Sequence, residues 1–503
     1  MPDKNIKRIL LNMAYFFMAV VLAKLIGMLS SFLLARILQP ANFGIWTTLL
    51  LIPTYSGIAH FGTLEAHLKQ YPYHVGKEEL DKAGEIENGT FGSIFIASTL
   101  ILLAAFSFDQ FVDAGRLVIP VQLIRLMALA TVIGLFTLFF QNRCAAHQNF
   151  KLVGQIETFR AVSNCFFLVF CTLMWGILGT VFGLIVSDLM ICLFARFLSY
   201  RYCGRLRAVF SPQLLWNLVR IGLPITIFWW IFILQTTVDR IVSITFLGKT
   251  ATGYYGLSVA LVSTIMLLPQ VVSRVLYPKI NMEVGANSSN DELFRLVIMP
   301  TRALSLILPL ALGLLLIVSP VIYTQLLPKY LPGLACAQIL IFFSFFRLTL
   351  ANGANFLIAT NRQKLLLSFV IISLVSGCTA SILTIKAGFN INGIAVSTGL
   401  AGALLALLMW KTVFRDMGYN TRQQWKEILL LYAPFLTLLP LLVILLIFPI
   451  NAGNNIKIIF SNMITFIILF CLLIYWVPPF NRWARELLLL VNKDVFRNSL
   501  KKI

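Results

Sequence analysis

Charged residues are scarce in this sequence. Asp, Glu, Lys and Arg together make up 12% of its 503 residues, while hydrophobic residues make up 59%. An average soluble domain has roughly 25% charged residues, so this composition excludes an ordinary soluble fold. A membrane-spanning helix needs about 20 consecutive apolar residues, and stretches of that kind recur along the whole chain. We therefore predict an all-α, polytopic membrane protein without a long soluble domain.

Motifs for catalysis and metal binding are missing as well. The sequence has no G-x-S-x-G, H-E-x-x-H, Walker A or D-x-D motif, which argues against hydrolysis, ATP use and metal-dependent glycosyl transfer. Its eight Cys residues form no C-x-x-C pair, which argues against disulfides and a metal site. The spacing also predicts no constellation among the four histidines, His60, His67, His74 and His147. We expect no enzyme activity, no cofactor and no metal.

Fourteen apolar stretches are predicted to span the membrane. Their approximate bounds are 9–37, 43–64, 89–108, 121–141, 157–175, 178–199, 221–247, 253–278, 299–319, 331–358, 365–386, 391–411, 427–448 and 457–477. Residues 480–503 follow the last span and are typical of an amphipathic helix on the inner membrane surface. A solvated tail fits that segment equally well.

Acidic residues are few, 19 against 40 Lys and Arg, which gives a formal net charge of +21. Such a charge could indicate nucleic acid binding, but most basic residues lie in alternate loops between the spans. This is the positive-inside pattern, which places both termini in the cytoplasm and attracts anionic headgroups. The opposite side receives few cations: Arg116, Lys249, Lys329, Lys386 and Lys457. We therefore predict a multi-pass membrane protein with no nucleic acid partner.

Three short segments recur in order at offsets of 209 to 213 residues, which indicates an internal repeat. The pairs are Leu38–Trp46 with Leu247–Tyr255, Ala146–Leu152 with Ala359–Leu365, and Gly183–Ser187 with Gly393–Ser397. Parallel repeats of this kind are typical of transporters whose halves rock around a central site. We predict two pseudo-symmetric six-helix bundles and two extra helices before a cytoplasmic amphipathic tail, with bounds 1–208, 209–420, 421–479 and 480–503.

Ionisable residues inside the predicted spans are mostly cationic. Each costs about 2.5–3.5 kcal/mol at the centre of a membrane helix, so such residues usually face protein or water and mark function. The six cations and two anions are Lys24, Arg36, Arg125, Arg240, Arg274, Arg347, Asp188 and Asp239. The excess of cations predicts an electropositive cavity that attracts anions, and phosphate groups suit Arg and Lys well.

Position within the spans separates these residues. Three cations lie near span ends, where long side chains can reach the headgroups: Arg36, Arg125 and Arg274. Lys24 and Arg347 lie near the middle, so we favour a water-filled cavity for them over a hidden ion pair. Asp239 and Arg240 are adjacent, and adjacent side chains on a helix do not face each other. We expect each to find its partner on another helix or in the cavity.

Two motifs carry a resemblance to a known family. Residues 35–44 read ARILQPANFG, which resembles the A-R-x-L-G-P-x-x-[FY]-G pattern after the first helix of bacterial O-antigen-type polysaccharide flippases. Gln39 replaces the usual Gly. From Asp239 to Ala260 the chain is similar to the family's D-R-x-x-[IL]-x-x-x-L-G-x-x-x-x-G-x-Y-x-x-A, with Ala260 one place late. The resemblance extends over essentially the whole chain and includes the count of fourteen helices.

The resemblance implies a MATE-like fold within the multidrug/oligosaccharidyl-lipid/polysaccharide exporter superfamily. It also implies that an undecaprenyl-pyrophosphate-linked oligosaccharide moves from the cytoplasmic to the outer leaflet of the bacterial inner membrane, as in O-antigen and lipopolysaccharide biosynthesis. Cations would hold the pyrophosphate in the cavity: Lys24 by the family's pattern, Arg347 by its chemistry, and Arg240 and Arg36 as further candidates. The implied partners are the lipid-linked substrate, membrane lipids, a polysaccharide polymerase and a chain-length regulator.

A cation-coupled multidrug or toxin extruder of the same fold is the main alternative. Extruders of organic cations need acids in the cavity, so the cationic interior argues against this function. Asp188 and Asp239 are nevertheless candidate residues for coupling to H⁺ or Na⁺, and an ion pair with a neighbouring helix fits Asp188 equally well. A membrane polymerase or ligase would need an outward catalytic loop, and the longest ones, 109–120 and 320–330, are too short.

Overall fold

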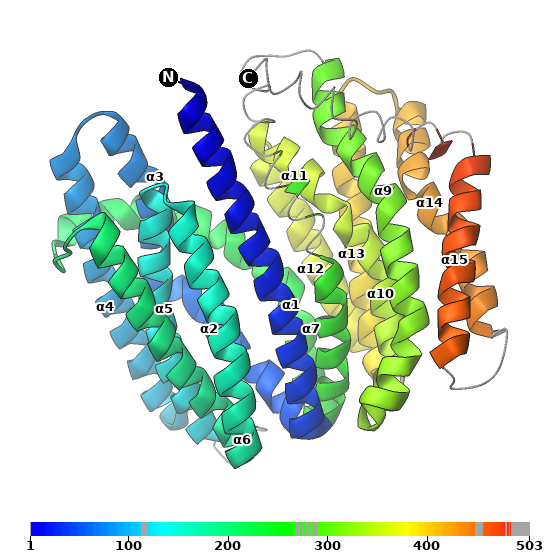
Figure 1. Ribbon diagram of the computed structural model, residues 1–503, viewed down its shortest axis with the longest axis horizontal. Helices are drawn as coiled ribbons and strands as arrows, with labels where there is room; N and C mark the ends of the chain where they lie inside the picture. The colour runs from blue at the N-terminus through cyan, green and yellow to red at the C-terminus, as the bar shows by residue number, and fades with distance from the viewer. Residues whose placement is uncertain are drawn as a thin grey trace. The chain divides into compact units, whose positions relative to one another are not determined.

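The computed structural model describes residues 2–111, 119–266, 290–447 and 456–477, with single residues between 267 and 289 and at 480, 481 and 483. These residues fold as helices joined by short connections (Figure 1). Nine helices in the described part are long and apolar enough to cross a membrane. The predicted class, an all-α polytopic membrane protein, is therefore confirmed, and the count of fourteen spans stays a prediction.

The chain divides into two compact units, Met1–Ala260 and Leu261–Ile503. The first contains α1 (Pro2–Leu49), α2 (Leu51–Ser56), the 3₁₀ helix η1 (Gly57–His60), α3 (Thr63–Gly76), α4 (Leu80–Phe111), α5 (Val121–Ala146), α6 (Phe150–Cys203) and most of α7 (Pro212–Ile265). Helices α4, α5 and α6 pack side by side. Their core is made of residues such as Ile94, Ala128, Phe139, Ile156 and Ile191.

The second unit is built around α9 and α13. Its elements are α9 (Asn290–Val321), the π-helix η3 (Ile322–Leu326), the 3₁₀ helix η4 (Pro328–Gly333), α10 (Leu334–Leu348), α11 (Leu350–Ala359), α12 (Gln363–Lys386), α13 (Asn390–Asp416), α14 (Thr421–Ile447) and α15 (Ile456–Trp476). Helix α9 contacts α10, α14 and α15, while α13 contacts α10 and α12. Arg302 of α9 ties α14 to this unit through an ion pair with Glu427 at 2.5 Å.

Helix α6 contains two membrane-crossing arms rather than one. Its 54 residues would measure about 80 Å if straight, far more than the ~30 Å apolar core of a bilayer. The chain reverses at Gly176, whose φ of 59° lies in the left-handed region. The hydroxyls of Thr172 and Thr180 then meet at 2.9 Å, and those of Ser163 and Ser187 meet at 2.8 Å. The two arms hold the predicted spans 157–175 and 178–199.

Left-handed backbone positions recur at nearly the same offset as the sequence repeat. They pair at offsets of 209, 213, 212 and 214 residues as Gln39 with Gly248, Gln148 with Asn361, Gly176 with Gly388, and Gly204 with Gly418. Turns therefore fall at matching places in the two predicted halves, which supports the repeat. The domain boundaries stay a prediction, because the compact units divide at Ala260 and not at residue 208, and most of 480–503 lies outside the described residues.

Both sequence motifs coincide with places where the backbone needs glycine. Gln39 adopts φ 64° and ψ 169°, a region nearly reserved for Gly, which explains why the first motif usually has Gly there. A Cβ on Gly44 would lie 1.8 Å from the carbonyl oxygen of Lys249, and one on Gly253 would lie 1.8 Å from that of Pro40. Helices α1 and α7 thus cross with their backbones in contact, as small residues allow between membrane helices.

Candidate functional site

The six predicted site residues lie on four helices. In the first unit, Lys24 and Arg36 are exposed on α1, Asp188 is half-buried on α6, and α7 carries the buried Asp239 and the half-buried Arg240. Arg347 is half-buried on α10 of the second unit. The structure thus brings Asp239 and Arg240 into one polar cluster, while the shared role of all six residues in one cavity stays a prediction.

Asp239 is buried, with 6% of its surface exposed, and both of its carboxylate oxygens have donors. The Tyr255 hydroxyl donates to Oδ2 at 2.6 Å, and the backbone N–H of Arg240 donates to Oδ1 at 2.8 Å. Tyr255 reaches Asp239 because α7 reverses at Gly248, where φ is 78°. Asp239 forms no ion pair with Arg240 among the described residues, which agrees with the expectation that adjacent side chains diverge.

Arg240 keeps an unused hydrogen-bond donor. Its Nε is buried and has no hydrogen-bond partner among the described residues, and the same holds for Trp230 Nε1. The short helix α2 places Tyr55 beside them: its hydroxyl lies 2.6 Å from Thr237 Oγ1, and its ring meets that of Trp230 edge-on at 6.1 Å. We call Tyr55, Trp230, Thr237, Asp239, Arg240 and Tyr255 the α7 cluster.

A buried guanidinium donor without an acceptor is costly in a low-dielectric environment. In the α7 cluster the acid is already satisfied by Tyr255 and by a backbone N–H. Tyr55 lies within electrostatic reach of both Asp239 and Arg240. The arrangement therefore leaves a donor at Arg240 that an anionic oxygen would satisfy.

Arg347 lies in the last turn of α10, where the helix is interrupted at Thr349 before α11 begins. Helix C-termini carry partial negative charge and favour cations there. The stem of Arg347 packs on α13 at Gly402, where a Cβ would lie 3.0 Å from Arg347 Cγ. Interrupted helices are typical of substrate sites in transporters, and the role of Arg347 in binding stays a prediction.

Asp188 faces a different surrounding on the second arm of α6. It forms no ion pair within 4 Å among the described residues, and Arg160, on the first arm, is the cation whose charge acts on it. Arg160 itself donates from Nη2 to Gln141 Oε1 at 2.8 Å. Gly134 of α5 faces this carboxylate, because a Cβ added to Gly134 would lie 3.9 Å from Asp188 Oδ2. Asp188 thus stays a candidate coupling residue without a direct partner.

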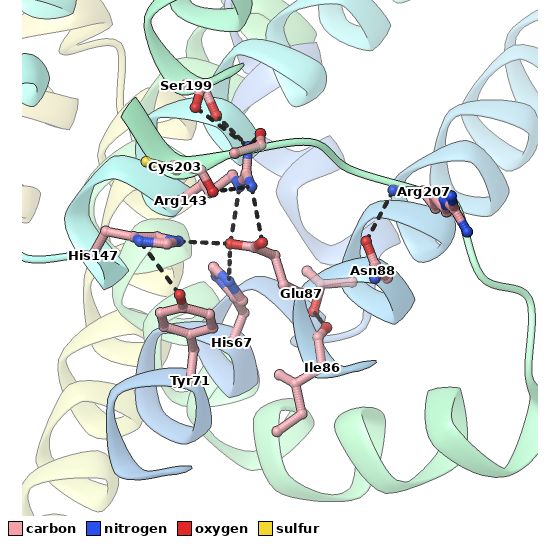
Figure 2. A network of polar contacts seen from close by, with 12 residues as sticks. His67, Tyr71, Ile86, Glu87, Asn88, Arg143, His147, Ser199, Cys203 and Arg207 are labelled. Atoms are coloured by element: carbon pink, nitrogen blue, oxygen red, sulfur yellow. Dashed lines mark hydrogen bonds and ion pairs between the residues drawn. The ribbon is translucent and has the colours of Figure 1, made fainter. Parts of the chain in front are cut away.

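A second charged cluster was missed by the sequence analysis. The prediction that the histidines form no constellation was wrong, because His67 and His147 both approach Glu87 (Figure 2). Arg143, which is completely buried, completes this Glu87–Arg143 network. The spacing of these four residues in the sequence does not indicate the network, since they come from α3, α4, α5 and the turn after α5.

Every guanidinium nitrogen of Arg143 has an oxygen within 3.1 Å. Nε lies 2.9 Å from Glu87 Oε1, and Nη2 donates to Glu87 Oε2 at 3.0 Å and to the Cys203 carbonyl at 2.8 Å. Nη1 donates to Ser199 Oγ at 3.0 Å and to the Gly204 carbonyl at 3.1 Å. Arg143 therefore joins α4 and α5 to the C-terminal end of α6 and is paired with the Glu87 carboxylate.

His67 and Tyr71 close the network on the α3 side. Burial lowers the pKa of His67 to about 4, so its imidazole is neutral at physiological pH. Burial and then the Glu87 carboxylate raise the pKa of Tyr71 to about 12, so its hydroxyl stays protonated. That hydroxyl lies 3.3 Å from His147 Nδ1, while His147 Nε2 lies 3.0 Å from Glu87 Oε1.

Sequence comparison links the first half of the chain to one family. The family model described as "Polysaccharide biosynthesis protein" matches residues 9–282, which is more than half of the chain. This range includes both glycine-containing motifs and the whole α7 cluster. Among curated proteins, no sequence matches the chain.

Solved structures with the same fold are a flippase and transporters. The lipid II flippase MurJ, in an inward closed conformation, has a TM-score of 0.70 and 14% identity, covering 92% of this chain and 98% of that one. An inward-facing multidrug resistance MATE family transporter of the MOP superfamily has a TM-score of 0.61 and 13% identity, covering 80% and 94%. An outward-facing multidrug resistance MATE family transporter of the MOP superfamily has a TM-score of 0.60 and 11% identity, covering 81% of this chain and 95% of that one. At these identities the likeness shows the fold.

Proposed function

We propose, since the chain belongs to the polysaccharide biosynthesis protein family, that it is a flippase for an undecaprenyl-pyrophosphate-linked oligosaccharide. The substrate would move from the cytoplasmic to the outer leaflet by alternating access. The likeness in fold to the lipid II flippase MurJ and to MATE transporters supports this proposal, because alternation between inward- and outward-facing states is the motion such two-bundle folds use.

The unused donor of Arg240 is the observation that carries the proposal. A cation buried in a membrane protein usually faces a partner or a functional path. Arg240 has no carboxylate partner among the described residues, and its Nε has no acceptor. A phosphate oxygen would satisfy that donor, and guanidinium groups bind phosphates strongly with two parallel hydrogen bonds. The pyrophosphate of a lipid-linked sugar supplies such oxygens.

The other predicted cations extend this proposed path. Lys24 and Arg36 lie on α1, and neither forms an ion pair among the described residues. Arg347 lies at the interruption between α10 and α11. We propose that these three attract the pyrophosphate as it enters and leaves, while Arg240 holds it. The aromatic rings of Tyr55 and Trp230 would then face the sugars.

Coupling to H⁺ or Na⁺ is proposed for the acids. Asp239 is buried and receives two hydrogen bonds without an ion pair among the described residues. Asp188 has only the charge of Arg160 acting on it. A change of charge at either site would alter the balance around the nearby arginine and favour one state over the other.

A multidrug extruder is the second candidate, and the same buried Asp239 favours it. An organic cation could pair with that carboxylate if Tyr255 released it. The two functions differ in the residue that matters most, because an extruder needs Asp239 and a flippase needs Arg240. We place the flippase first because the acid is satisfied and the arginine is not.

The setting that follows from the proposed function is bacterial surface polysaccharide synthesis. We propose that the protein lies in the inner membrane with both termini in the cytoplasm, as the positive-inside pattern indicates. O-antigen, and hence lipopolysaccharide, is the pathway we propose, with a polymerase and a chain-length regulator as partners.

The test uses cells that lack this protein while the rest of the glycan pathway is intact. The leaflet that holds the lipid-linked repeat unit is measured, and the cells are complemented with wild type, Arg240→Gln, Lys24→Ala, Arg347→Ala and the surface control Arg220→Gln. We expect wild type and the control to move the repeat unit outward, and Arg240→Gln to leave it inside.

Two results would contradict the proposal. If the repeat unit reaches the outer leaflet without the protein, the flippase function is wrong and drug export should be measured instead. If wild type and Arg240→Gln clear the inner leaflet equally well, the function stands and the assignment of Arg240 does not.

A further inference from the structure

The second arm of α6 carries a basic groove near its C-terminal end. An open groove of about 560 Å³ is lined by Leu193, Arg196, Phe197, Tyr200, Arg201 and Arg205. The first five follow one another at helical spacing, so they share one face of the helix. Three arginines therefore meet three apolar or aromatic side chains on a single surface, which belongs to neither the α7 cluster nor the Glu87–Arg143 network.

Aromatic rings hold two of these guanidinium groups in place. Arg196 lies 5.3 Å from the ring centre of Tyr200, and Arg201 lies 6.0 Å from that of Phe197. Cation–π contacts of this kind orient arginine without neutralising it. In the part of the chain that the structure describes, Arg196, Arg201 and Arg205 form no ion pair with an acid. The groove thus keeps three uncompensated positive charges.

The membrane side of the groove is apolar and exposed. Leu193 is 50% exposed and Phe197 is 57% exposed. Three residues that precede the groove on the same arm are exposed as well: Phe182, Leu189 and Met190. Exposed apolar side chains on a membrane-spanning helix contact acyl chains, whereas long basic side chains at its end reach the headgroups. The face therefore changes from apolar to basic along its length, as a phospholipid does from tail to phosphate.

The end of α6 is fixed in position by the Glu87–Arg143 network. Arg143 donates to the carbonyl oxygens of Cys203 and Gly204 and to the Ser199 hydroxyl. These acceptors lie on either side of Arg201 and directly before Arg205 in the chain. The buried arginine thus satisfies carbonyls at the helix C-terminus and holds the basic groove in a defined shape without using any of the groove's own charges.

We propose that this groove binds the phosphate headgroup of an anionic phospholipid. Arginine is suited to the bidentate binding of phosphate oxygens, and basic residues at a membrane surface attract anionic lipids. A soluble phosphate would make no use of Leu193 and Phe197, which places a membrane lipid ahead of a free anion. The lipid's acyl chains would lie along the exposed apolar stripe of α6.

The test measures lipid binding to the purified full-length protein in neutral detergent by native mass spectrometry. Phosphatidylglycerol is the anionic probe, phosphatidylcholine is the zwitterionic probe, and inorganic pyrophosphate is added as a soluble competitor. The groove variant is Arg196→Gln/Arg201→Gln/Arg205→Gln. The control variant, Arg220→Gln/Lys364→Gln/Arg422→Gln, removes the same charge from exposed residues elsewhere.

We expect wild type and the control to bind phosphatidylglycerol alike, and the groove variant to bind it at least about tenfold more weakly. Phosphatidylcholine should bind weakly to all three. Replacing the three arginines with Lys keeps the charge and should retain part of the affinity, which separates loss of charge from loss of fold.

Three results would overturn the proposal. The groove variant could bind phosphatidylglycerol as tightly as wild type, or phosphatidylcholine could bind wild type equally well. If pyrophosphate displaced the lipid at equal concentration, the groove would be a site for soluble anions instead. None of these measurements depends on transport, so the groove and the flippase function can fail independently.

Discussion

Two regions of the first unit each combine a buried carboxylate with an arginine, and they differ in whether the arginine is paired with that carboxylate. In the Glu87–Arg143 network, every guanidinium nitrogen lies near an oxygen of the protein. In the α7 cluster, Asp239 is satisfied by Tyr255 and a backbone N–H, and Arg240 Nε has no acceptor among the described residues. Arg143 is thus paired with a carboxylate of the protein, and Arg240 forms no ion pair among the described residues.

This difference separates a structural role from a binding role more clearly than charge alone does. Both arginines are partly or fully shielded, and both lie on helices of a membrane protein. Breaking a complete network leaves a buried charge without a partner, which costs stability. Removing an arginine whose donor is unused takes little from the folded protein, so its cost appears in ligand binding.

Replacing Arg143 should cost the most stability. Arg143→Met leaves Glu87 buried without its cation and frees the carbonyls at the end of α6, so we expect a loss of about 3–5 kcal/mol. Thermal unfolding in detergent, followed by circular dichroism, measures this loss. The double variant Arg143→Met/Glu87→Gln should recover part of it because the unpaired charge is gone. A melting temperature unchanged by Arg143→Met would show that the network does not stabilise the unit.

His67 should make stability depend on pH in a defined window. Its pKa is about 4 in the folded protein and about 6.5 when unfolded, so the unfolded chain binds more protons between these values. The stability that the neutral His67 contributes is therefore fully present above pH 6.5. It is lost as the pH falls toward 4, and the loss amounts to about 3 kcal/mol. His67→Phe should remove that part of the slope and melt like wild type at pH 8. An unchanged slope in the variant would contradict the assignment.

Tyr255 should contribute a smaller amount in the α7 cluster. Tyr255→Phe removes the hydroxyl that donates to Asp239 at 2.6 Å, and a hydrogen bond to a charged group contributes about 1.5–3 kcal/mol. We expect a loss of that size by thermal unfolding at pH 7. Tyr475→Phe, at an exposed position, is the control. Equal melting of both variants would mean that Asp239 does not depend on Tyr255.

Much of the fold could be predicted from the sequence because membrane helices follow directly from apolar runs. The structure also explains the glycine positions of the two motifs. Gly44 and Gly253 allow the backbones of two helices to touch, and the chain turns at residue 39. The repeat was visible as weak similarity, and the recurring left-handed residues support it. The exact number of spans and the domain boundaries stay predictions.

The site was harder to predict, since its contacts join residues far apart in the chain. Asp239 and Arg240 could be selected because charges in apolar spans are unusual. Tyr55 could not, because a tyrosine near a helix end is common and its neighbour Thr237 is 182 residues away. The histidines of the Glu87–Arg143 network lie on separate helices, so their spacing carried no sign of a common carboxylate.

The most direct measurement compares the binding of undecaprenyl pyrophosphate and of undecaprenol to the purified wild type, Arg240→Gln and Arg220→Gln. The two lipids differ only in the pyrophosphate, so the ratio of their Kd values reports the contribution of the phosphates. If the unused donor of Arg240 holds a phosphate, wild type and Arg220→Gln should prefer the pyrophosphate lipid, and Arg240→Gln should lose about 10- to 100-fold of that preference. An equal preference in all three proteins would contradict the account.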